Sequence, residues 1–107
     1  MAGSLFAAHI DEKSTIGPVS QAEVLVRAAR EGRDEEMASD IDALGIAVTP
    51  MPTDAGRRLA KLRAATAAKM PDCCVLLTAQ QADASVATFD DRLRRAAEGL
   101  GIRVLPC

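Results

Sequence analysis

Residues Met70 to Leu93, MPDCCVLLTAQQADASVATFDDRL, decide the fold of this chain. The stretch predicts a short helix, a turn, a short strand and the start of another helix. Pro71 suits a first helical position, because its missing N–H and fixed φ cost nothing there, and Asp72 follows in the first turn, where the helix dipole favours a carboxylate. Asp90 follows the predicted strand at 85–88. It therefore falls at the sheet edge where open α/β sheets place their ligand sites.

The composition limits the classes of function. The chain has 107 residues and is interpreted as a single domain over 1–107. It contains two Phe and no Trp or Tyr, so stacking platforms for single-stranded nucleic acid are nearly absent. Any action on nucleic acid would depend on phosphate contacts or metal chemistry. The net charge of −2 excludes a surface that is basic all over but allows a local basic patch.

The sequence also indicates the cellular compartment of the protein and the redox state of its cysteines. No run approaches the roughly 18 apolar residues of a membrane span, and the N-terminus lacks the features of a signal peptide. Three cysteines do not make a disulfide framework. Cys73 and Cys74 lack a Cys-x-x-Cys partner, so we interpret them as core residues and not as zinc ligands. The protein is expected to be cytoplasmic and reduced, with no membrane association.

Strands and helices are expected to alternate along the chain. Ser20 and Glu23 have the spacing of a capping box at the start of a helix, and Thr53 can cap another. Met37, Ile41 and Leu44 recur as one apolar helical stripe. Strands are predicted at 14–17, 46–49, 85–88 and 102–105, and helices at 2–13, 20–32, 33–44, 53–68, 70–79 and 91–99. This alternation predicts an α/β fold with a short parallel sheet flanked by helices.

Glu23, Asp72 and Asp90 are the candidate site residues, since each lies at the start of a predicted helix. Clustered carboxylates suit Mg²⁺ or Mn²⁺, which prefer oxygen ligands, and a metal held this way can activate water against a phosphoryl group. On spacing alone, three independent helix caps are the commoner arrangement. Asp91 is interpreted as a helix-start charge. Thr88 is interpreted as a strand residue, with a hydrogen bond to a ligand carboxylate as the alternative.

The remaining candidates are weaker. His9 is the single histidine, and no nucleophile motif lies near it. Gly99 and Gly101 precede a predicted strand, so they do not form a phosphate loop. Basic residues recur at 27–33 and at 57–61. Such runs are usually solvated helix faces, but they would steer a polyanion if they flanked the acids.

Three motifs resemble those of a known family. They are the stretches Ile16–Val26, Lys69–Ala79 and Ala87–Leu93, and the ending from Ala96 to Leu105 fits as well. In this order they resemble the second, third and fourth acidic motifs of PIN-domain ribonucleases, specifically the VapC-like toxins of bacterial type II toxin–antitoxin systems. The resemblance covers about residues 15–105.

The resemblance implies a PIN-like three-layer fold with Glu23, Asp72 and Asp90 as the catalytic, metal-binding acids. It implies an Mg²⁺- or Mn²⁺-dependent endoribonuclease that cleaves RNA, is silenced by a tightly bound antitoxin and forms a homodimer. The family's first strand, which ends in Asp, is expected to be absent, because Asp11 and Glu12 do not match that motif. An active enzyme would need a fourth acid, from Asp11, Asp91 or a partner chain. The alternatives are a catalytically silent relative that keeps the antitoxin-binding or dimer surface, and a capped α/β domain without a site.

Overall fold

Helix α4, Met70–Ala82, lies at the centre of the molecule. All seven residues from Cys73 to Ala79 are buried, as expected for a helix that is apolar on every side. The helix begins as predicted, with Pro71 in its first turn. It contacts α1 and α3 as well as strands β1, β2 and β4.

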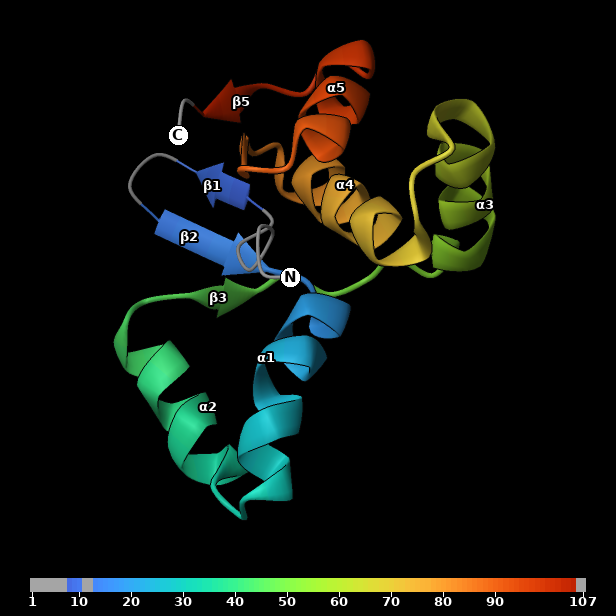
Figure 1. Cartoon of the computed structure of the whole chain (residues 1–107). Helices are drawn as coiled ribbons and strands as arrows, with labels where there is room; N and C mark the ends of the chain where they lie inside the picture. The colour runs from blue at the N-terminus through green and yellow to red at the C-terminus, as the bar shows by residue number, and fades with distance from the viewer. Residues whose placement is uncertain (1–7, 11–12, 106–107) are drawn as a thin grey trace.

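The computed structural model describes residues 8–10 and 13–105 (Figure 1). These residues form an α/β fold of short strands and five helices. The order is β1 (Ala8–Ile10), β2 (Lys13–Ile16), α1 (Pro18–Arg30), α2 (Asp34–Ala43), β3 (Ala47–Val48), α3 (Ala55–Thr66), α4 (Met70–Ala82), β4 (Val86–Ala87), α5 (Asp91–Gly99) and β5 (Val104–Leu105). No helix within these ranges is both long and apolar enough to cross a membrane.

The strands form two small sheets where the sequence predicted one. β2 pairs in parallel with β3, and β4 pairs in parallel with β5. β1 pairs with β2 antiparallel. The helix predicted over 2–13 is therefore wrong at 8–10 and at Lys13, and the rest of that prediction lies outside the described residues. Only residues 11 and 12 separate β1 from β2. So short a connection joins antiparallel strands, because a parallel pair needs a long crossover. β1 also contacts β4, so the two sheets are neighbours.

Two hydrophobic cores hold the elements together. The larger core surrounds α4 and includes Leu62 from α3, Val86 from β4 and Leu93 from α5. The smaller core contains Ile16, Ile41 and Ile46 together with half-buried residues of α1 and α2. Figure 1 shows α1 and α2 as a pair that extends away from α4 and α5.

Several helix ends differ from the sequence-based expectations. α1 begins at Pro18 with Gly17 as its N-cap, so Ser20 lies inside the helix, buried, and the capping box with Glu23 is wrong. α3 has Asp54 and not Thr53 at its N-cap. Leu44 is 75% exposed, because it lies beyond the last turn of α2 and no element covers it.

The junction of β2 with α1 touches the central helix. A Cβ atom at Gly17 would overlap Oγ1 of Thr78, which lies in the buried part of α4. The Thr78 hydroxyl donates a hydrogen bond of 2.9 Å to the carbonyl oxygen of Cys74. The glycine therefore allows the start of α1 to approach α4 closely, and α1 is the helix that carries Glu23.

Candidate active site

Asp72 lies at the N-terminal end of α4, where the burial of this helix begins. Its side chain is half-buried, and the loss of solvent raises the pKa of the carboxyl. The carboxylates of Asp90 and Glu23 raise this pKa further, whereas the ammonium group of Lys69 opposes them. Asp72 is therefore within electrostatic reach of both other candidate acids.

Asp90 is held at the N-terminus of α5 by its own backbone and side chain. Its Oδ1 accepts hydrogen bonds from the backbone N–H of Arg92 at 2.8 Å and of Leu93 at 3.3 Å. Thr88, which is buried, accepts the backbone N–H of Asp90 through Oγ1 at 3.0 Å. The N-cap interpretation of Asp90 is confirmed. Both cap bonds use Oδ1, so Oδ2 is not needed for the cap. The carboxylate can therefore cap α5 and still bind a ligand through Oδ2.

Glu23 reaches the site from a different direction. It is exposed in the second turn of α1, and α1 contacts α4. Because Ser20 does not cap the helix, Glu23 has no capping-box partner. The three candidate acids thus come from the start of α4, the start of α5 and the flank of α1.

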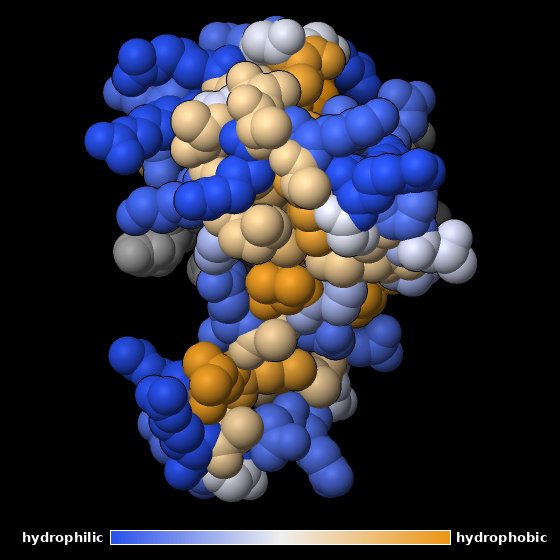
Figure 2. All heavy atoms as spheres, turned by 90° about the vertical axis from the view of Figure 1, so that its right-hand side faces the viewer, coloured by the Kyte–Doolittle hydropathy of each residue, from blue (hydrophilic) through white to orange (hydrophobic). Residues whose placement is uncertain are grey.

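A hollow of about 910 Å³ opens beside Asp72 and Asp90. Its walls come from the end of α3, the α3–α4 connection and one face of α5. Three basic side chains, those of Lys69, Arg92 and Arg95, line it together with the two acids. The remaining lining residues are Ala65, Thr66, Ala67, Ala68, Ala96, Gly99 and Leu100. Figure 2 shows strongly hydrophilic side chains on either side of a weakly hydrophobic band on the face that carries α3.

Comparison with protein families gives the context for this arrangement. Residues 5–99 match the model of the family described as PIN domain. The chain belongs to the PIN-domain family. No curated protein and no solved structure matches the chain in the corresponding comparisons. PIN domains are typically nucleases that act with divalent metal ions such as Mg²⁺.

The donors of this PIN domain fit a hard divalent ion in their chemistry. Glu23, Asp72 and Asp90 offer only oxygen atoms, which Mg²⁺ and Mn²⁺ prefer. A cation would also favour the ionised form of Asp72, whose pKa is raised by burial and by the neighbouring carboxylates. In the part of the chain that the structure describes, however, no three His, Cys, Asp or Glu side chains lie close enough to hold a metal ion as they stand. The site therefore has suitable ligand types, but Glu23 and Asp90, both exposed, would have to move toward Asp72 to complete it.

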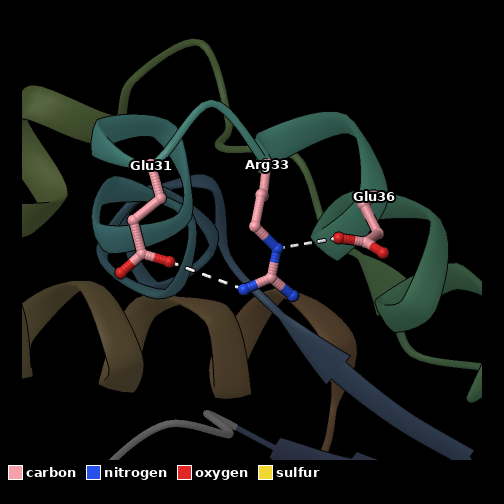
Figure 3. A network of polar contacts seen from close by, with 3 residues as sticks. All are labelled: Glu31, Arg33 and Glu36. Atoms are coloured by element: carbon pink, nitrogen blue, oxygen red, sulfur yellow. Dashed lines mark hydrogen bonds and ion pairs between the residues drawn. The ribbon is translucent and has the colours of Figure 1, made fainter.

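Arg33, at the end of the first basic run, is remote from the acids. Arg33 lies in the α1–α2 connection, where its guanidinium pairs with Glu36 at 2.8 Å and with Glu31 at 3.5 Å (Figure 3). The bond and charge of Glu36 raise the pKa of Arg33 above its already high ordinary value. These side chains are all more than half exposed. This network belongs to the far end of the α1–α2 pair and does not flank the site.

Arg58, in the second basic run, also lies away from the acids. Arg58 donates hydrogen bonds to Gln81 and, at 3.5 Å, to Gln80. Both glutamines lie near the C-terminal end of α4. At 1.5 Å per residue, that end is about 12 Å along the helix from Asp72. The cations beside the acids are instead Lys69, Arg92 and Arg95, which the sequence analysis did not single out. The sequence feature that could have indicated these cations is their position next to the acidic motifs.

The other candidates do not join the described site. Cys73 and Cys74 are buried core residues with free thiols, and burial raises the pKa of both. Asp91 is exposed in the first turn of α5. His9 lies in β1, opposite Ser14 in the register of the strands. Two more acids, Asp11 and Glu12, lie outside the described residues, so a fourth acid from this segment stays a prediction.

Proposed function

We propose that this PIN domain is a metal-dependent endoribonuclease toxin of a toxin–antitoxin pair. It would cleave RNA phosphodiesters with Mg²⁺ or Mn²⁺ held by Glu23, Asp72 and Asp90. The observation that carries the proposal is the placement of Asp72 and Asp90 in one hollow that three cations also line. Glu23 lies on α1, which contacts the helix that carries Asp72. Family membership supports nuclease chemistry. The toxin role, the antitoxin partner and the homodimer rest on the resemblance of the acidic motifs to VapC-like toxins.

The side chains have separate tasks in this proposal. A divalent ion bound here would lower the pKa of a water molecule and offset negative charge on the phosphoryl oxygens. Asp72 supplies a carboxylate from a rigid, buried helix. Asp90 supplies one through Oδ2 while Oδ1 keeps the cap of α5. Thr88 is a positioning residue, because its hydroxyl accepts the N–H of Asp90 and fixes the backbone there.

One observation favours a second candidate, a catalytically inactive PIN protein that binds an antitoxin or a second copy of itself. No three potential ligands among the described residues are close enough to hold a metal. In addition, Val26 and Leu44 are exposed on the α1–α2 pair, and Figure 2 shows hydrophobic side chains gathered on the lower, visible face of this pair. An inactive relative would keep such a surface without a working site.

Calorimetric titration with Mn²⁺ tests the first candidate. The chain is compared with Asp72→Asn and with Asp42→Asn, a matched control on the exposed side of α2. We expect the chain and the control to bind Mn²⁺ alike and Asp72→Asn to lose the binding. A fluorescent single-stranded RNA is then incubated with each protein and Mn²⁺. The chain and Asp42→Asn are expected to cleave the RNA, and Asp72→Asn is expected to leave it intact.

The outcomes separate the two candidates. Mn²⁺ binding that is unchanged in Asp72→Asn would refute the acidic site as the metal centre. If neither the chain nor Asp42→Asn binds Mn²⁺ or cleaves RNA, the nuclease proposal fails. Sedimentation analysis alone and with a candidate antitoxin then tests the inactive binding protein.

A further inference from the structure

Three cations line the hollow beside the acids, and they come from two separate parts of the chain. Lys69 precedes α4, whereas Arg92 and Arg95 lie on α5. The two arginines are three residues apart, so they share one face of the helix. Arg95 Nε donates to the backbone oxygen of Asp91 at 3.4 Å, which braces the stem of this side chain along α5. Its terminal guanidinium nitrogens are not used in that bond.

The rest of the lining suits a sugar–phosphate chain better than a base. It contains no aromatic side chain on which a base could stack and consists mostly of alanine and glycine. The hydroxyl of Thr66 is engaged, since it donates to the Leu62 carbonyl at 2.6 Å and accepts the Ala68 N–H at 3.1 Å. The volume of about 910 Å³ lies near the upper end of the roughly 300–1,000 Å³ of ligand pockets. A nucleotide unit therefore fits the hollow better than a bare ion.

We infer that Lys69, Arg92 and Arg95 form a subsite for the phosphates of RNA nucleotides next to the bond that the acids would cut. This inference rests on the proposed function for the position of the cut, but the binding itself needs only the cations. Because the contacts are to phosphate, the subsite binds RNA with little preference for sequence and with strong dependence on salt.

The neighbouring acids control the strength of this binding. Without a metal, the carboxylates of Asp72 and Asp90 repel a phosphate that enters the hollow. Replacing both by Asn removes the repulsion while keeping similar shapes, and Asn is as good an N-cap as Asp at position 90. The double variant is therefore expected to bind RNA several-fold more tightly than the unchanged chain when EDTA is present.

The test measures RNA binding without metal or cleavage. Fluorescence anisotropy of a short labelled single-stranded RNA is followed in EDTA over a series of salt concentrations, with the Asp72→Asn/Asp90→Asn protein as the parent. Arg92→Gln and Arg95→Gln are each compared with Arg30→Gln, which removes the same charge from the last turn of α1. Arg92→Gln and Arg95→Gln should each weaken RNA binding about threefold or more. Each should also reduce the slope of log K against log salt by about 0.7, the value for one phosphate contact on a single strand. Arg30→Gln should change neither.

The result also distinguishes this inference from the proposed function. If Arg92→Gln and Arg95→Gln bind RNA like Arg30→Gln, the subsite is refuted, even if the chain cleaves RNA with Mn²⁺. If the arginine variants lose binding as expected, the subsite is supported, even if no cleavage or Mn²⁺ binding is found. A strong preference for oligo(U) over oligo(A), or the reverse, would contradict recognition through phosphates alone.

Discussion

Gly17→Ala should destabilise the protein through one contact with the central helix. The backbone at Gly17 has φ −87° and ψ 169°, which alanine adopts without strain, so the cost comes from the new methyl group. This group would displace Oγ1 of Thr78 and break its hydrogen bond to the Cys74 carbonyl. Leaving a buried hydroxyl without a partner costs about 1–3 kcal/mol, and we expect a loss of about 2 kcal/mol in the free energy of unfolding. Urea unfolding followed by circular dichroism should show a midpoint lower by about 1 M.

Thr78→Ala provides the control in a double-mutant cycle. Once Oγ1 is removed, the nearest remaining atom to the new methyl group is the Cβ of residue 78, at 3.6 Å, an ordinary contact. In this background Gly17→Ala should change the stability little, because the restriction of the unfolded chain by alanine, about 0.4–1 kcal/mol, is offset by the loss of glycine at the N-cap of α1. The loss of stability should therefore nearly disappear, with a coupling energy of about 2 kcal/mol. An equal loss of stability in both backgrounds would refute the close approach of Gly17 to Thr78.

Substitutions at Asp72, Asp90 and Ala67 also have defined outcomes. Burial and the neighbouring carboxylates raise the pKa of Asp72 in the folded state. Between the pKa of the unfolded chain, about 4, and this raised pKa, the folded protein binds more protons than the unfolded chain. The protein therefore loses stability as the pH rises through this range. Metal-free Asp72→Asn should therefore be more stable than the unchanged chain at pH 7, with a difference that disappears on acidification; a constant difference in urea unfolding at all pH values would contradict this. Asp90→Ala should lose about 1 kcal/mol of stability with its cap, whereas Asp90→Asn should lose almost none, and equal losses would exclude the cap as the cause. Ala67 has a φ of +59° at the end of α3, so Ala67→Gly should gain about 0.5–1 kcal/mol in thermal unfolding, whereas Ala60→Gly within the same helix should lose about 1 kcal/mol.

The sequence contained strong local signals for most helices. Pro71, the apolar run of α4 and the cap at Asp90 each act within a few residues, and the structure confirms all three. The sheets depended on long-range pairing. Strands of two to four residues are too short to show a period of two. Neither the direction of β1 nor the division into two sheets could therefore be predicted from the sequence.

The site was predictable only in part, because some of its residues are positioned by local signals and others by tertiary contacts. Alternation of strands and helices suggested that Asp72 and Asp90 reach one edge of the fold, and both side chains line the same hollow. The turn after α3 brings Lys69 to the hollow that Arg92 and Arg95 line from α5. That turn uses a left-handed conformation at Ala67, where glycine is the usual residue. Alanine therefore gave no indication of the turn, and the cations beside the acids were missed.

The two separate cores differ in size, and this difference affects how Glu23 can move relative to the other two acids. The core beneath α1 and α2 contains three buried residues, Ile16, Ile41 and Ile46, whereas the core around α4 contains many more. Segments with few buried contacts open at a lower free energy than the rest of a protein, and their amides exchange hydrogen sooner. Glu23 belongs to the segment with the smaller core, and Asp72 belongs to the helix that should exchange last. A local opening of α1 and α2 would therefore withdraw one carboxylate while the other two stay in place, so the set of three acids could be dismantled without global unfolding.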